Sequence, residues 1–522
     1  MSSPNITTIP LEILIHIASY LNAEEYGAVR LTCKHLEVSL FRTFALQYFS
    51  KIQFMRTEFS LQALIDISES RLSSFLKHVA IGTGIISNLG ASDGISRVAP
   101  RYASINFVTH TDNNLEKQIK YNRFSQLAAD QEVFIHTGLD QQMLIRAFRN
   151  LDLERVCVCG PCDNAWIGTS EEPFIVATTS YGTSQIFRET SVKLTSSIGR
   201  TTRATEMSLT SKCVQSLLYA LGESGSKPKR FDIMTSSCSS SDQAFHFPTF
   251  MDKTIIPIIS GLEAIHWDLD LHHNQYKRLI STPGRVICEI DTYYLRKFLS
   301  HAPQIKHLHL GSLYDHDGLF EWIGMPAPTE AYDGPSEFEP PISPMFSQLR
   351  ELEIVSCSMH AQQLLKVIRK HSATLQKLYV DDTSFFDFDV DAATRFIKGL
   401  AQVGRHLKDV HLSFFAAGDH DSPITITGRY SRFGTFSYKG PNMKEELEAL
   451  KVIGPSPNQY HDEDFDYTDE DEYYESDDYD QFNGFAEFGD YLQEQEHMLG
   501  FEDFFDDIEG GLILAASWTQ GN

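Results

Sequence analysis

The sequence predicts an α/β protein in three parts: a helical module at the N-terminus, a solenoid of repeated strand–helix units, and a disordered acidic tail. Three observations support this prediction. Apolar residues near the start recur at helical spacing, a strand-like pattern recurs through the middle of the chain, and acidic residues crowd the C-terminal end. We place the three parts at residues 1–50, 51–455 and 456–522, with the most regular repeats at 262–415.

The composition is that of an ordinary globular protein, but the charge is unevenly distributed. The chain has 522 residues, of which 42% are hydrophobic and 22% charged, enough for a large core and more than one structural unit. The net charge is −26, yet 21 acidic residues fall between Asp462 and Glu509, and no Lys or Arg follows Lys451. An acidic balance argues against nucleic-acid binding, which requires clusters of Lys and Arg.

The termini and the cysteines indicate an intracellular protein. The start, MSSPNITTIP, lacks the basic and apolar regions of a secretory signal, and no apolar run is long enough to cross a membrane. The eight Cys residues show no disulfide framework, so we expect reduced thiols. We therefore expect a location in the cytoplasm and/or the nucleus, and no membrane partner.

The segment IPLEILIHIASYL, residues 9–21, predicts a short helix that is apolar over more than half of its circumference. Only Glu12, His16 and Ser19 share the polar side. A surface helix usually has a narrower apolar stripe, so this one needs cover on two sides, from its own domain alone or from its domain and a partner. Asn22 is suited to begin a second helix, and Thr32 to cap a third through CKHLEVSLFRTFALQYF.

This pattern resembles the F-box, a helical module that binds the Skp-family adaptor of cullin ubiquitin ligases. Two positions depart from the family: Ile9 stands where it often has Leu, and His35-Leu36 where it has an aromatic residue. The resemblance implies adaptor-binding residues at Ile9, Pro10, Leu11, Ile13, Leu14, Ile17, Tyr20, Leu21, Val29, Leu31 and Cys33. The alternative is an ordinary three-helix cap that is buried on the following domain.

In the middle of the chain, apolar residues recur at positions one, four and six of short segments. The segments are Leu76-Val79-Ile81, Leu153-Val156-Val158, Leu262-Ile265-Trp267, Ile305-Leu308-Leu310, Leu349-Leu352-Ile354, Leu375-Leu378-Val380 and Leu407-Val410-Leu412. This is the strand signature of leucine-rich repeats, and Cys357 falls where such a repeat expects Asn or Cys. Helix-like stretches between the copies imply parallel strands with right-handed crossovers.

The regularity of this pattern varies along the chain. Before residue 262 the pattern fades, so the number of true repeats there stays open. The Pro-rich segment at 325–345 interrupts the later copies. We expect the repeats to stack into a curved solenoid, a horseshoe with a concave strand face.

The residue between positions four and six of each strand is expected to point to the concave face, because side chains alternate along a strand. From residue 262 onward these residues are His266, His309, Glu353, Tyr379 and His411. Such a polar row suits recognition of a protein segment, and Tyr379 is its best anchor. The alternative is that these are merely solvated strand residues.

The motifs that suggest enzyme chemistry are incomplete. CVCGPC brings together Cys157, Cys159 and Cys162, a spacing compatible with zinc or thiol exchange, but no partner pair of Cys follows. These are better explained as strand-end thiols. We find no phosphate-binding Gly loop and no nucleophile elbow. The sequence therefore predicts no catalytic residue, no metal ion and no cofactor.

The tail mixes dense acid with Phe and Tyr, and like-charge repulsion favours disorder. Its aromatic residues are compatible with binding a basic partner or folding back on the solenoid, and a plain solubilising tail is the alternative. Thr468, followed by Asp469, Glu470 and Asp471, lies in an acid-directed phosphorylation context.

The resemblance to fungal-type F-box proteins with irregular leucine-rich repeats implies a function. The protein would be a non-catalytic substrate-recognition subunit of a Skp–cullin–F-box ubiquitin ligase, with an unknown protein as substrate. One alternative is an adaptor-independent scaffold whose acidic tail binds basic proteins such as histones. Another is a zinc or thiol enzyme centred on Cys157–Cys162. The sequence does not reveal the identity of the substrate or whether it must be phosphorylated.

Overall fold

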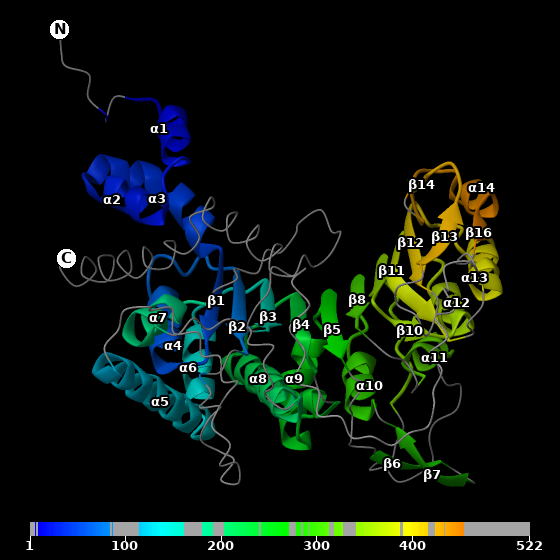
Figure 1. Ribbon diagram of the computed structural model, residues 1–522, viewed down its shortest axis with the longest axis horizontal. Coiled ribbons are helices and arrows are strands. Elements are labelled where there is room, and N and C mark those ends of the chain that lie inside the picture. Colours follow the sequence, from blue (N-terminus) through cyan, green and yellow to red (C-terminus); the bar gives the residue numbers. More distant parts are fainter. Residues whose placement is uncertain are drawn as a thin grey trace. The chain divides into compact units, whose positions relative to one another are not determined.

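Figure 1 shows the computed structural model of the chain. It describes residues 6, 9–83, 86, 114–160, 180–191, 203–239, 242–270, 278–282, 285–290, 292–312, 318–326, 341–386, 390–415, 423–432 and 434–453. The predicted acidic tail with Thr468, Cys162, and most of the Pro-rich segment lie outside these residues. Among the helices that are described, none has the length and apolar character needed to span a bilayer.

The described residues divide into two compact units, one ending at Tyr48 and the other beginning at Phe49. The first contains three helices, α1 (Leu11–Ala18), α2 (Ala23–Leu31) and most of α3 (Lys34–Phe49). Their ring-bearing side chains form its centre, where Tyr26 packs edge-on against Phe44 with ring centroids 5.3 Å apart, and Phe44 lies 5.1 Å from Tyr48. The predicted domain boundaries stay predictions.

The helix ends of the first unit show why the chain turns where it does. Asn22 accepts a hydrogen bond from the Glu25 backbone N–H at 2.8 Å, and the Glu25 carboxylate accepts one from the Asn22 N–H at 3.2 Å. This reciprocal capping box confirms Asn22 as the start of the second helix. Thr32 does not cap the third helix as predicted. Its hydroxyl donates to the Val29 carbonyl at 2.7 Å, because the last carbonyls of α2 lack helical partners.

The second unit is built on a sheet of parallel strands that pair in sequence order, as Figure 1 shows from blue to yellow. These strands are β1 (Lys51–Met55), β2 (His78–Gly82), β3 (Arg155–Cys159), β4 (Arg230–Ser239), β5 (Ala264–Asp270), β8 (His307–Gly311), β9 (Glu351–Val355), β11 (Lys377–Phe385) and β12 (Asp409–Phe415). The two-residue strand β10 (Ser358–Met359) also pairs with β11 in parallel. This open sheet fits a solenoid; the leucine-rich repeats and the horseshoe stay predictions.

Antiparallel strands complete this sheet beyond β12. β13 (Pro423–Thr427) and β15 (Thr435–Lys439) both pair with β12, β14 (Ser431–Arg432) pairs with β15, and β16 (Lys451–Ile453) pairs with β13. A separate hairpin is formed by β6 (Arg278–Thr282) and β7 (Arg285–Ile290). The change to antiparallel pairing ends the run of strand–helix units.

Helices connect the strands and cover the apolar face of the sheet. They are α4 (Glu58–Ser68), α5 (Asn114–His136), α6 (Leu139–Phe148), α7 (Thr183–Thr190), α8 (Arg203–Ser224), α9 (Asp252–Ile259), α10 (Tyr293–Ser300), α11 (Leu319–Gly324), α12 (Ala361–Lys370), α13 (Val390–Val403) and α14 (Met443–Glu448), with two short 3₁₀ turns at Asp242–Phe245 and Thr249–Met251. Trp267 of β5 is fully buried, with its rings 5.2 Å from Phe298 of α10 and 4.8 Å from Phe245. The predicted apolar strand positions are therefore the core.

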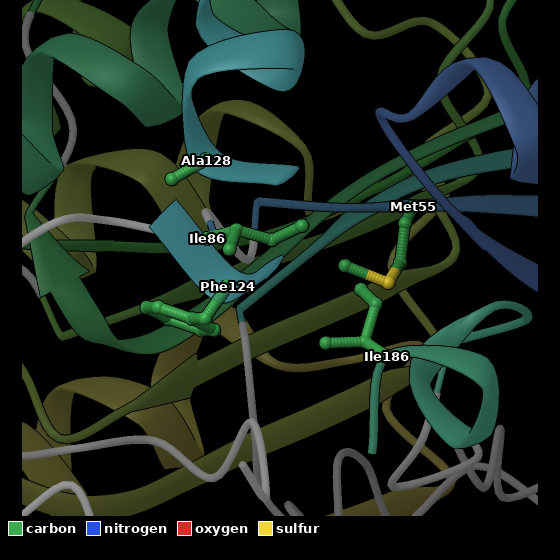
Figure 2. Close-up of a cluster of buried hydrophobic side chains, with 5 residues drawn as sticks. All are labelled: Met55, Ile86, Phe124, Ala128 and Ile186. Atoms are coloured by element: carbon green, nitrogen blue, oxygen red, sulfur yellow. The ribbon is translucent and has the colours of Figure 1, made fainter. Parts of the chain in front are cut away.

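The N-terminal end of the second unit has a cluster of its own, drawn in Figure 2. Met55 of β1, Ile86, Phe124 and Ala128 of α5, and Ile186 of α7 bury their side chains together there. Segments far apart in sequence thus close this end of the sheet. The cluster adjoins a pocket of about 200 Å³, whose wall includes Phe59, Leu127 and the ion pair between Arg123 and Glu189 at 2.6 Å.

A buried ion pair connects the end of β1 to the start of α6. Arg56 donates from Nη2 to Oδ2 of Asp140 at 2.5 Å and from Nε at 3.1 Å, and both side chains are buried. We expect Arg56→Met to destabilise the protein by about 3–5 kcal/mol, because it leaves a buried carboxylate unpaired. The double variant Arg56→Met/Asp140→Leu should recover most of this loss in urea unfolding. A double variant no more stable than the single one contradicts this assignment.

Candidate functional site

The first helix exposes an apolar stripe to solvent. Leu11, Ile13, Ile17 and Tyr20 are between 44% and 76% exposed. Ile13 and Ile17 are four residues apart, so they lie along one side of the helix, and Tyr20 follows in the turn directly after it. Leu14 and Ala18, roughly 100–140° around the helix from Ile13, are buried in the centre of the unit. Leu11, in the first turn, lies roughly 160° from Ile13. We call Ile13, Ile17 and Tyr20 the α1 stripe.

The other residues that the resemblance assigned to the adaptor differ in exposure. Pro10 is exposed, and five residues are half-buried: Ile9, Leu21, Val29, Leu31 and Cys33. Leu14 is 4% exposed, so it supports the helix from inside and offers no free surface. The structure adds Val38 and Leu46 of α3 as exposed apolar residues that the sequence interpretation missed. Val38 and Leu46 point to a different side of α3 than the buried Leu36, Leu40 and Phe44. A helical wheel of this segment could have distinguished the exposed residues from the buried ones.

In the second unit, strand pairing aligns the five predicted concave-face residues into one row. His266 pairs in register with His309, His309 with Glu353, Glu353 with Tyr379, and Tyr379 with His411. The same register continues through Asp232 and Cys157 on the N-terminal side. We call the five predicted residues the polar row. The predicted ladder is thus present in the structure, and its binding role stays a prediction.

Members of the polar row contact one another closely. The rings of His266 and His309 stack with centroids 3.6 Å apart and planes 8° apart, and Nδ1 of His309 lies 2.8 Å from Oε2 of Glu353. Farther along, Tyr379 stacks on His411 at 4.3 Å and donates its hydroxyl hydrogen to Asp381 at 3.0 Å. His266 and His309 are only 3% and 7% exposed. The alternative of merely solvated strand residues is therefore wrong for these two.

Burial and charged neighbours together set the protonation of His266 at the buried end of the row. Asp232 is fully buried and pairs with Arg155 and with Arg230, whose Nε lies 3.0 Å from both carboxylate oxygens. Burial is the main cause that holds the pKa of His266 well below its usual 6.5, and the positive charge of Arg230 acts in the same direction. His266 is therefore a neutral imidazole, and its buried Nε2 has no hydrogen-bond partner.

A neighbouring row of charged or titratable residues lies two residues before the polar row on β8, β9, β11 and β12, namely His307, Glu351, Lys377 and Asp409. The Glu351 carboxylate lies 2.9 Å from Nδ1 of His307 and 2.8 Å from Nζ of Lys377. Burial opposes the ionisation of Glu351, but these two hydrogen bonds outweigh it and hold its pKa at about 2. A small cavity of about 30 Å³ lies between the two rows, with a wall that includes His266, His309 and Glu353.

Farther along the polar row, the stack on His411 and the hydrogen bond to Asp381 fix the orientation of Tyr379. Burial, and then the Asp381 carboxylate, raises the pKa of the Tyr379 hydroxyl, so it stays protonated. The hydrogen bond from His411 is the main cause that lowers the pKa of Asp381. The Tyr379 side chain therefore has a fixed orientation and a neutral polar tip.

The cysteines of CVCGPC show no sign of a reactive thiol in the part of the chain that the structure describes. Cys157 and Cys159 are fully buried on β3, with sulfur atoms 3.1 Å apart. Burial, and then the hydrogen bond with Cys159, raises the pKa of Cys157 well above its usual value. A thiol rather than a thiolate is expected at pH 7, which disfavours thiol exchange.

Comparison with known proteins concerns the first unit. A family model described as F-box-like matches residues 6–45, the segment that contains the α1 stripe. No curated protein matches the chain. The chain thus contains an F-box-like domain, which supports an F-box protein and suggests in general a substrate-recognition subunit of a Skp–cullin–F-box ligase. Domains of this kind generally bind Skp-type adaptors, and proteins that carry them are generally non-catalytic.

The two sides of α1 make different predictions for stability. Leu14→Asp should open the first unit, because a carboxylate would replace a buried leucine in its centre. Ile17→Asp changes an exposed position and should cost no more than about 0.5 kcal/mol. Hydrogen exchange of the full chain, followed over residues 11–48, compares the two variants. Equal loss of protection in both would show that the assigned inner and outer sides are incorrect.

Proposed function

We propose that this protein is a substrate-recognition subunit of a Skp–cullin–F-box ubiquitin ligase, acting in the cytoplasm and/or the nucleus. In this proposal the first unit binds the Skp-type adaptor and, through it, the cullin. The second unit is a solenoid of irregular leucine-rich repeats, as in fungal-type F-box proteins, and binds a target protein. The observation that carries the proposal is the exposed α1 stripe inside the segment that matches the F-box-like family model.

The energetics of the α1 stripe favour a protein partner. Contiguous apolar residues on the surface of a protein are costly in water and mark interaction sites. Fully burying a large apolar side chain is worth about 1.5–3 kcal/mol, and the residues of the stripe are each about half or more exposed. Tyr20, the most exposed, brings a large ring with a polar tip and little entropy to lose. A partner helix or groove of apolar character fits this surface.

For the target, the polar row offers a preformed surface on the second unit. Tyr379 is half-buried, and its stack on His411 and hydrogen bond to Asp381 already restrict its rotamers. Binding therefore costs less side-chain entropy than an unrestrained Tyr would. The gain in ubiquitination would come from proximity, since a receptor that holds a lysine near the charged enzyme raises its effective concentration. No catalytic residue is required of this chain.

A second candidate function rests on the charge of the C-terminal segment. Its 21 acidic residues between Asp462 and Glu509 favour capture of basic proteins by a scaffold that needs no adaptor. The two functions differ in the unit on which they depend. A scaffold of this kind would keep its activity when the α1 stripe is changed and lose it when residues after Pro457 are deleted.

The adaptor proposal predicts a selective effect of one exposed residue. Ile17→Asp should weaken binding of a Skp-type adaptor at least 100-fold, about 2.7 kcal/mol, because the carboxylate would have to be desolvated in an apolar interface. Co-purification of adaptor and cullin with the full chain measures this. The matched control is Leu115→Asp on α5, an exposed apolar position in the second unit. Recovery of adaptor by Ile17→Asp at the wild-type level would refute the proposal.

The polar row makes a separate prediction about the target. Tyr379→Ala should weaken target capture about 10- to 100-fold without changing adaptor recovery, because it removes the anchoring ring. His309→Ala and His411→Ala should have smaller effects. The same capture is measured for chains that lack 326–344 or the residues after Pro457. If Tyr379→Ala captures the target normally and one of the deletions abolishes capture, the target site lies in the deleted segment and not on the polar row.

A further inference from the structure

Two histidines and a glutamate meet at the buried end of the polar row. His266 of β5, His309 of β8 and Glu353 of β9 come from adjacent strands, and one donor atom from each lies within 4.8 Å of the other two. Strand pairing fixes their backbones and brings the two imidazoles into contact, and the nearly parallel rings have to tilt apart for both to point a nitrogen at one ion. The cluster is therefore built by the fold and does not depend on flexible surface side chains.

One atom of this cluster is without a partner in a place where water is scarce. Nε2 of His266 is buried and has no hydrogen-bond partner, and the residue as a whole is only 3% exposed. Buried polar atoms are almost always hydrogen-bonded, so an exception points to a missing ligand or to a function. A neutral imidazole nitrogen of this kind is the form that binds a metal ion.

We propose that His266, His309 and Glu353 bind one divalent transition-metal ion, with Zn²⁺ as the ion that fits best. Two imidazole nitrogens and one carboxylate oxygen form a frequent zinc donor set, and three protein ligands leave a fourth position for water. This inference revises the prediction from sequence that the chain holds no metal. It goes beyond the proposed ligase function and does not depend on it.

The dimensions of the site suit an ion of this size. Zinc–ligand bonds of about 2.0–2.2 Å place tetrahedral donors about 3.4 Å apart. Donors that lie within 4.8 Å of one another therefore need to close by roughly 1.4 Å at most, which ring rotation and the Glu353 side chain can supply. The 2.8 Å contact between His309 and Glu353 is already short enough. The adjacent cavity of about 30 Å³ has room for about one water molecule as the fourth ligand.

Both positive and negative side chains surround the site. The positive ones are neutralised by ion pairs, so the surroundings favour a cation. Arg230 and Arg155 lie on the N-terminal side, but both are paired with the buried Asp232. On the other side, Gly311 has no side chain to separate His309 from a second carboxylate. A Cβ at Gly311 would lie 3.3 Å from Nε2 of His309 and 3.2 Å from Oδ1 of Asp268. Glu353 thus contacts His309 directly, and Asp268 is a second carboxylate, on the other side of Gly311 from that ring.

The test uses the purified full chain after treatment with a chelator. Titration with Co²⁺, a spectroscopic substitute for Zn²⁺, should give the visible absorption of a four-coordinate ion at one equivalent, and Zn²⁺ should displace it. Glu353→Gln and His266→Ala should each weaken binding at least 100-fold, as loss of a ligand costs no less than loss of its supporting partner. The matched control is His406→Ala, which removes an exposed histidine and should leave the titration unchanged.

Thermal unfolding of each metal-free variant checks the fold. Glu353→Gln changes the shape of the side chain very little, so it still tests metal binding if His266→Ala does not fold. Adaptor recovery is measured in parallel, and its loss or retention bears only on the ligase proposal. Absence of a stoichiometric cobalt spectrum in the wild type, or an unchanged spectrum and affinity in Glu353→Gln, would overturn the metal site.

Discussion

Backbone hydrogen bonds between parallel strands, made in sequence order and in register from β1 to β12, are the constraint on which the second unit depends. Side chains alternate across each strand, so a fixed register gives each of β5, β8, β9, β11 and β12 one residue in the apolar layer and the next in the polar row. Trp267 contacts the helices for this reason, while His266 beside it faces His309 on the next strand. A shift by one residue would exchange the two layers.

The same register explains how so many polar groups can be buried. Asp232 is paired with two arginines, Glu351 with His307 and Lys377, and Tyr379 with Asp381. Each pairing satisfies a charge or a hydrogen bond that would otherwise be costly away from water. Nε2 of His266 departs from this rule, as do a few other buried atoms such as Oε1 of Gln53. At His266 the departure coincides with two further donor side chains within 4.8 Å, and this combination gives the metal proposal its physical basis.

Much of the architecture could be predicted from spacing alone, because apolar residues at positions one, four and six are required wherever such a strand packs on a helix. Two of the nine described strands that pair in sequence order from β1 to β12, namely β1 and β4, were not predicted by this pattern. Their first positions hold Phe49 and Pro228, which are buried but are not the aliphatic residues that the pattern requires. The burial of His266 could not be predicted, since it depends on a ring 43 residues away in sequence that only strand pairing brings into contact. The α1 stripe was predicted as a helix with two apolar sides, but which side faces inward depends on how Leu14 packs in the unit.

In the function that we propose, the α1 stripe is a docking surface for a Skp-type adaptor. Hydrogen exchange of the purified full chain is measured with and without purified adaptor. We expect saturable binding with added protection of the amides between Leu11 and Leu21 and no added protection in strands β5 to β12. Absence of binding, or protection confined to those strands, would contradict this proposal.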